Sequence, residues 1–269
     1  MTAQQKLKKR LDQGLHICVG LDTDISKIPE HLHSSPNPVL EFNKIIIENT
    51  YKYAAAYKIN FAFYEKEGTQ GFDNILETIK YLPVKEILTI GDAKRGDIGN
   101  TSQMYAKSVF EYFNFDSITI NPYMGFDSIQ PFLSYHDKIN FILALTSNPG
   151  SNDFEKLKLD NGLYLYQQVI NTVTSWNVEK NCGLVFGATN LDELKANINL
   201  FRDLPILLPG VGSQGGDLEG VVKTFRNANN NNFIINVSRA LIYCDSSMEF
   251  GKKVNQALQE LNRTISKII

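Results

Sequence analysis

Two acids and two bases lie close together in the stretch DAKRGD, residues 92–97, directly after the apolar run ILTIG. If residues 87–94 form a strand, Asp92 and Lys94 point to the same face, because side chains alternate along a strand. Asp97 follows Gly96, where we expect the chain to have turned into a loop. Such charges are costly to bury and ordinary in water. The hexapeptide alone therefore fits either a charged site or a solvated strand end with salt bridges.

Eight short and almost wholly apolar runs are separated by segments with a helical pattern. Unbroken apolar runs are typical of parallel strands that are buried on both faces. Eight strand–helix units predict a (β/α)₈ TIM barrel that forms a single domain over residues 1–269. A doubly wound open sheet is the alternative, because periodicity does not show closure. The runs are 16–20, 55–59, 87–91, 117–121, 141–145, 183–187, 205–209 and 233–237.

The composition is that of an ordinary soluble globular protein, with 43% hydrophobic and 21% charged residues. A net charge of −2 gives no electrostatic case for binding nucleic acid or an acidic membrane surface. Cys18, Cys182 and Cys244 are too few and too scattered for a disulfide framework or a zinc site. The N-terminal stretch has no apolar core, and no run approaches the length of a membrane span. We therefore expect reduced thiols and a cytoplasmic protein.

Polar residues follow the apolar runs at the positions where a barrel would place its functional groups, the carboxyl ends of the strands. Asp22 follows the first run, Lys58 lies near the end of the second, and GATN (187–190) follows the sixth. The fifth leads into TSNPGSNDFEKLKLDN, which is long enough to cover a site. Turn formation explains many of these residues. It does not readily explain a lysine in the second strand or the lysine–aspartate pair in the third.

The segments after the seventh and eighth runs indicate an anion site. PGVGSQGGD brings several glycines just before a helix, so that backbone amides can face an anion at the helix N-terminus. Arg239 follows the eighth run and could hold the same anion through paired hydrogen bonds. Barrels frequently bind phosphate between these two loops. By contrast, His31 and His33 lack a third ligand nearby, and we predict no metal site.

The motifs resemble those of the orotidine 5′-monophosphate decarboxylase family. DAKRGDIGNTS matches its D-x-K-x-x-D signature in the form of the longer bacterial branch, and NPYMGFDSIQPF, TSNPGS, GAT, LLPGVGSQGGD and NVSRA follow in order. Related hexulose-phosphate synthases share the signature alone. The resemblance implies decarboxylation of orotidine 5′-monophosphate to uridine 5′-monophosphate (UMP), the last step of de novo pyrimidine biosynthesis. It also implies that no metal or organic cofactor is needed, and that a homodimer forms with composite active sites.

The resemblance gives each strand-end residue an expected role. Lys94 matches the proton donor, and Asp92 matches the carboxylate that crowds the substrate carboxylate and helps to hold the lysine. Lys58 matches the second lysine of the charge network, which also contacts the ribose. The other matches are Asp22 at the ribose, Ser147 at the pyrimidine, Gln214, Gly215 and Arg239 at the phosphate, and Asp97 and Thr101 donated by the neighbouring subunit.

Three alternatives use the same features. A Schiff-base aldolase would need Lys58 or Lys94 as a free amine, which flanking carboxylates disfavour because they raise a lysine pKa. A metal-dependent phosphosugar lyase could be built on the same barrel. A catalytically silent phosphate-binding barrel would gain little from keeping the full Asp/Lys/Asp set.

Overall fold

The computed structural model describes residues 1–212 and 215–269. Within them, eight parallel strands pair in chain order, and β8 pairs with β1 to close a barrel. Closure confirms the predicted (β/α)₈ barrel and excludes the open sheet. The strands are β1 Ile17–Gly20, β2 Ala56–Asn60, β3 Leu88–Arg95, β4 Ser117–Ile120, β5 Ile139–Leu145, β6 Cys182–Phe186, β7 Ile206–Leu208 and β8 Phe233–Val237.

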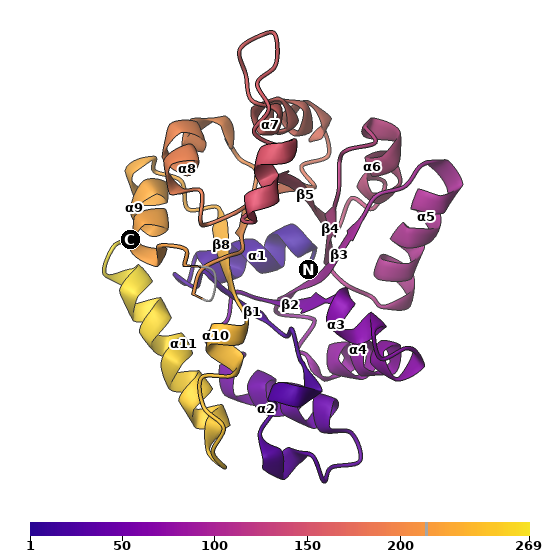
Figure 1. The fold of residues 1–269 in the computed structure, drawn as a ribbon, viewed down its shortest axis with the longest axis vertical. Helices are drawn as coiled ribbons and strands as arrows, with labels where there is room; N and C mark the ends of the chain where they lie inside the picture. Colours follow the sequence, from indigo (N-terminus) through magenta and orange to yellow (C-terminus); the bar gives the residue numbers. More distant parts are fainter. Residues whose placement is uncertain (213–214) are drawn as a thin grey trace.

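Helices surround the barrel on its outer side (Figure 1). The α2 helix begins with a capped first turn, because Asn37 accepts a hydrogen bond from the Leu40 amide and Pro38 occupies the first helical position. No helix in the described part of the chain is long and apolar enough to cross a membrane. The helices are α1 Ala3–Leu11, α2 Pro38–Thr50, α3 Phe61–Glu65, α4 Thr69–Tyr81, α5 Gly99–Lys107, α6 Phe126–Leu133, α7 Leu165–Trp176, α8 Leu191–Asn197, α9 Leu218–Asn227, α10 Arg239–Ile242 and α11 Phe250–Ser266.

The amino-terminal end of the barrel is filled by apolar side chains and covered by α1 (Figure 1). Leu7 and Leu11 of α1 are buried in one cluster with Leu88 and Phe141 of the strands. A buried ion pair, Lys6 to Asp116 at 2.6 Å, ties the helix to the segment before β4. This end is therefore a packed floor, which leaves the opposite end of the barrel for a site.

Alternation along the strands carries polar side chains into the barrel above this floor. On β2, Ala56 belongs to the inner apolar cluster, and Lys58 follows two residues later on the same side. On β3, Ile90 belongs to the same cluster, and Asp92 follows two residues later. A slip of one residue in either strand would turn these charges outward. The strand register thus brings a lysine and an aspartate from neighbouring strands together inside the barrel.

Candidate active site

A cavity of about 370 Å³ opens at the carboxyl ends of the strands. A larger groove, about 940 Å³, lies beside α8 and α9 on the outside of the molecule. Its lysines, Lys195 and Lys223, are largely exposed, whereas the smaller cavity contains buried charges. We therefore take the smaller cavity as the candidate site. Its lining includes six residues predicted from the sequence: Asp22, Lys58, Asp92, Lys94, Ser147 and Arg239.

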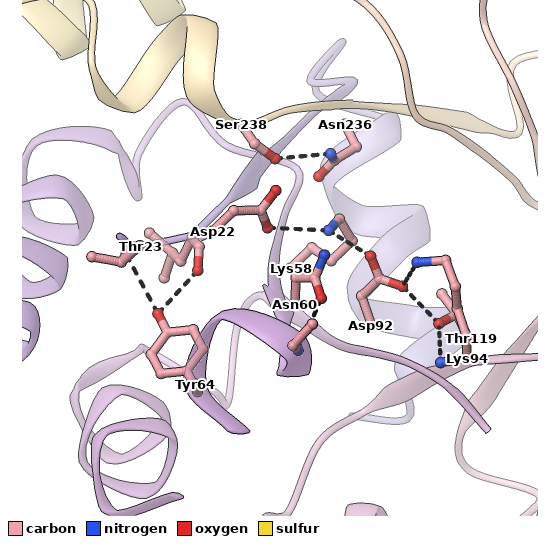
Figure 2. A network of polar contacts seen from close by, with 12 residues as sticks. Asp22, Thr23, Lys58, Asn60, Tyr64, Asp92, Lys94, Thr119, Asn236 and Ser238 are labelled. Carbon is pink, nitrogen blue, oxygen red and sulfur yellow. Dashed lines mark hydrogen bonds and ion pairs between the residues drawn. The ribbon is translucent and has the colours of Figure 1, made fainter. Parts of the chain in front are cut away.

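Four of these residues form a continuous row of alternating charges, Asp22–Lys58–Asp92–Lys94, which we call the charge chain (Figure 2). The Lys58 Nζ lies 3.4 Å from Asp22 Oδ1 and 2.8 Å from Asp92 Oδ2. The Lys94 Nζ lies 2.6 Å from Asp92 Oδ1. The Lys58 and Asp92 side chains are 4% and 8% exposed, whereas that of Lys94 is 50% exposed. Lys94 is thus the accessible end of a largely buried network.

The charge chain keeps its buried members ionised. Burial alone lowers the pKa of Lys58, but the charges of Asp22 and Asp92 outweigh burial and raise that pKa above its usual range. Burial alone raises the pKa of Asp92, but Lys58 and Lys94 outweigh it and hold that pKa well below its usual range. Asp92 is therefore a fixed negative charge at neutral pH, and Lys58 is not a free amine.

The end of β3 departs from the regular strand that the sequence suggested. Asp92 and Lys94 do meet, as predicted, but the pairing register with β4 shifts between Gly91 and Arg95. Lys94 has a φ of +46°, in the left-handed region. That conformation costs a residue other than glycine about 1–2 kcal/mol. The predicted strand forms and its two charged side chains meet, but a local irregularity interrupts its regular pairing before Arg95.

Ser147 lies in the cavity wall on a segment that is held from two sides. Glu155 accepts hydrogen bonds from the Thr146 amide at 2.7 Å and from the Thr146 hydroxyl. Asn190, from the GATN motif, donates to the Thr146 carbonyl at 2.9 Å. A Cβ on Gly187 would lie 2.7 Å from the Ser147 nitrogen. The GATN motif therefore packs directly against the segment that carries Ser147.

The predicted anion-binding loops lie next to each other at the cavity. Gly210 and Arg239 both line it, and a Cβ on Gly212 would lie 2.9 Å from that of Ala240. Gly210 and Gly212 have φ values of +105° and +87°, which favour glycine. Gly215, at φ +80°, donates its amide to the Gly212 carbonyl. Gln214 lies outside the described residues.

The structure does not bring Asp97 and Thr101 into the cavity of their own chain. The Asp97 carboxylate accepts a hydrogen bond from the adjacent Ile98 amide at 2.8 Å. Thr101 lies exposed on α5, and Ile98, which follows Asp97 in the chain, is 54% exposed. Both predicted residues are therefore on the outer rim, where a second molecule could contact them.

Comparison with known proteins identifies the family. A model of the "Orotidine 5′-phosphate decarboxylase / HUMPS family" matches residues 15–250. The chain belongs to this family. It is 42% identical over 271 residues to the orotidine 5′-phosphate decarboxylase of Flavobacterium johnsoniae, covering 100% of this chain and 98% of the relative. The corresponding protein of Christiangramia forsetii is 46% identical over 254 residues, covering 94% and 93%.

A solved structure agrees with the family assignment. The Leishmania donovani OMP decarboxylase superposes with a TM-score of 0.82 at 36% identity, covering 98% of this chain and 99% of that one. The orotidine 5′-phosphate decarboxylase family match runs from just before β1 to the start of α11, so it includes all eight described strands and every residue of the charge chain. The family match and the candidate site therefore coincide.

Sequence reasoning assigned no individual role to several polar residues at this decarboxylase-family site. Thr119 on β4 contacts Asp92 and Lys94, and Asn60 and Asn236 line the cavity. Asn236 is the one polar residue in the run FIINV, whereas Thr119 shares SITI with a second polar residue, Ser117. A lone polar side chain inside an apolar strand was the signal that could have found Asn236.

Proposed function

We propose that Lys94 supplies the proton with which this chain completes the decarboxylation of orotidine 5′-monophosphate to UMP. The reaction is that of its family, and it ends de novo UMP biosynthesis. The observation that carries the proposed role is the charge chain, which presents one half-exposed ammonium to the cavity beside three buried charges. A proton source next to a fixed negative charge suits a reaction in which a carboxylate departs and a carbanion is protonated.

Asp92 acts as a fixed negative charge that repels the substrate carboxylate. Its Oδ1 accepts hydrogen bonds from Lys94 and Thr119, and its Oδ2 accepts one from Lys58. These donors hold Asp92 ionised and in place. A substrate carboxylate bound beside it is destabilised, and the repulsion disappears as neutral carbon dioxide leaves. An interaction that is worse in the ground state than in the transition state accelerates the chemical step.

Lys94 protonates the ring carbon. The bond between C6 and the carboxylate breaks, its electron pair stays on C6, and carbon dioxide departs. One N–H proton of the Lys94 ammonium moves to C6 and forms the C6–H bond of UMP. Lys94 is left as a neutral amine and regains a proton from water, to which its half-exposed side chain has access. The positive charge of the ammonium also stabilises the developing carbanion.

The remaining cavity residues bind the nonreacting parts of the substrate. We assign Asp22 and Lys58 to the ribose hydroxyls and Ser147 to the pyrimidine. Arg239, Gly215 and Gln214 are assigned to the phosphate. Arg239 and the glycine-rich turn lie together at the cavity, as binding of a phosphate group by a guanidinium and backbone amides requires.

We assign Asp97 and Thr101 to the active site of a second copy in a two-fold homodimer. Their position on the outer rim supports this assignment, and a two-fold axis would place each pair at the other cavity. The protein then works in the cytoplasm as a single catalytic domain over residues 1–269. The free thiols of Cys18, Cys182 and Cys244 fit a reducing compartment.

A spectrophotometric assay tests the reaction. Chelator-treated protein should consume orotidine 5′-monophosphate with loss of its absorbance and release UMP and carbon dioxide in equal amounts. If the protein shows turnover only after a divalent metal is added, the metal-dependent phosphosugar lyase is favoured. A borohydride-trapped adduct on Lys58 or Lys94 with a sugar phosphate would favour the aldolase. If the protein binds nucleotide but turns over no substrate under any of these conditions, the catalytically silent phosphate-binding barrel remains as the explanation.

A further inference from the structure

The Thr119 side chain lies against the irregular part of β3 (Figure 2). Because the register shifts between Gly91 and Arg95, residues 92–94 of β3 all lie opposite this one residue of β4. Thr119 is 2% exposed and is absent from the cavity lining. It therefore lies behind the cavity wall, so that an influence on the reaction would pass through its neighbours.

The Thr119 hydroxyl makes two hydrogen bonds whose directions are fixed. It accepts from the Lys94 backbone N–H at 3.0 Å and donates to Asp92 Oδ1 at 2.8 Å. A backbone N–H can only donate and an ionised carboxylate can only accept, so the single hydroxyl proton goes to Asp92. One oxygen atom thus connects the backbone of Lys94 to the carboxylate that pairs with the Lys94 side chain.

These contacts form a closed ring. The Lys94 Nζ donates to Asp92 Oδ1 at 2.6 Å, Asp92 accepts from Thr119, and Thr119 accepts from the backbone of Lys94. The ring holds Lys94 at the left-handed φ of +46°. Such backbone conformations persist only where the surroundings fix them. The Lys94 backbone directs the ammonium, and the Asp92 carboxylate orients it. Without the Thr119 hydroxyl, these two groups would be held independently of each other.

We infer that Thr119 is a positioning residue for the proton donor, which extends the function proposed above and rests on it. Its hydroxyl fixes the Lys94 ammonium and the Asp92 carboxylate in one arrangement. Its loss should therefore lower the rate of the chemical step rather than weaken nucleotide binding. A purely structural threonine, present for the packing of a β-branched side chain in a strand, would instead affect stability alone.

The barrel contains a matched control in Thr89. Its hydroxyl also joins a backbone N–H to a carboxylate, accepting from the Asp116 amide at 3.0 Å and donating to Asp116 Oδ2 at 3.1 Å. Thr89 is 1% exposed and lies outside the cavity, at the start of β3. Replacement by valine removes the same two kinds of hydrogen bond at both sites with little change in shape.

The test compares Thr119→Val, Thr119→Ser and Thr89→Val with wild type for kcat, KM, UMP affinity and stability. We expect Thr119→Val to lose about 10- to 100-fold in kcat, as for loss of one hydrogen bond to a charged group. Its UMP affinity should stay within about threefold of wild type. Thr119→Ser, which keeps the hydroxyl, should recover most of kcat. Thr89→Val should lose stability and keep kcat.

Three outcomes would overturn the inference. The first is a kcat of Thr119→Val within about threefold of wild type. The second is a folded Thr119→Ser protein whose kcat is no higher than that of Thr119→Val. The third is a loss of kcat in Thr89→Val equal to the loss in Thr119→Val. If Thr119→Val does not fold, Thr119→Ala replaces it, and the alanine and serine variants must then differ about tenfold in kcat. Failure of the wild type to decarboxylate orotidine 5′-monophosphate would instead overturn the proposed function, so the two failures are distinguishable.

Discussion

Replacing Asp92 by asparagine removes the central negative charge of the charge chain and keeps the shape of the side chain. The change affects the two lysines differently. The Lys58 side chain is 4% exposed and would retain only Asp22, at 3.4 Å, as a counter-ion. The Lys94 side chain is half-exposed and can be solvated by water. The cost to stability therefore arises mainly at Lys58.

The expected loss follows from this burial. Removing one partner of a buried ion pair costs about 3–5 kcal/mol of stability. Because Lys58 keeps its contact with Asp22, we expect Asp92→Asn to lose about 3 kcal/mol. Loss of the ion pair with half-exposed Lys94 adds little to this loss of stability. At about 2–4 °C per kcal/mol for a chain of roughly this size, Tm should fall by about 6–12 °C. Because Asp92 is also a preorganised charge at the reacting centre, kcat should fall roughly 100- to 1000-fold.

The stability difference should depend on pH in one direction. The folded state holds the pKa of Asp92 below its usual range, since Lys58 and Lys94 outweigh the opposing effect of burial. A carboxyl of this kind stabilises the folded state fully above its unfolded pKa of about 3.9. This stabilisation is lost as the pH falls from there through the lowered folded pKa. The gap between wild type and Asp92→Asn should thus be full at neutral pH and narrow below about pH 4.

Urea unfolding and turnover, measured on the same preparations, separate the two effects. Asp116→Asn is the matched control, because Asp116 pairs with buried Lys6 at 2.6 Å far from the cavity. It should lose comparable stability and keep turnover within about threefold of wild type. An Asp92→Asn protein that is as stable as wild type, or that retains turnover within about tenfold, would refute the assignment of Asp92 as a paired and catalytically important charge.

Three further experiments test other parts of the site. Arg239→Ala should chiefly lower kcat/KM, and orotidine without its phosphate should be a very poor substrate, because remote binding energy is used at the reacting centre; equal rates for both substrates would contradict the phosphate site. Lys94→Ala and Asp97→Ala homodimers should each be nearly inactive, but co-refolding them should restore about a quarter of the sites, since about half the dimers are mixed. Absence of recovery in heterodimers verified by mass spectrometry would place Asp97 in its own chain's site. Gly187→Ala should raise KM, because its Cβ would lie 2.7 Å from the Ser147 nitrogen; an unchanged KM would show that the segment tolerates the displacement.

The succession of parallel strands and helices could be predicted because its local signals agree. Apolar runs without alternation, separated by capped helices such as the one beginning at Asn37 and Pro38, indicate parallel strands buried on both faces. The closure of the sheet could not be predicted in this way, since it depends on the pairing of β1 with β8. Neither strand has a residue pattern that identifies the strand with which it pairs.

The charged part of the site was predictable because lysine and aspartate are conspicuous at the ends of apolar strands. Asp22, Lys58, Asp92 and Lys94 do line one cavity. The role of Thr119 was not predictable, because a threonine in a strand is ordinary and its importance depends on a register shift in the neighbouring strand.

The Lys94→Ala variant shows whether the Lys94 ammonium supplies the proton to the substrate. Turnover of orotidine 5′-monophosphate and affinity for UMP should be measured on chelator-treated wild type and variant, with circular dichroism to verify folding. UMP affinity should stay within about threefold of wild type while kcat falls by at least about 10²–10⁴-fold, as for loss of a general acid. A folded Lys94→Ala protein with turnover within about tenfold of wild type would contradict this role of Lys94.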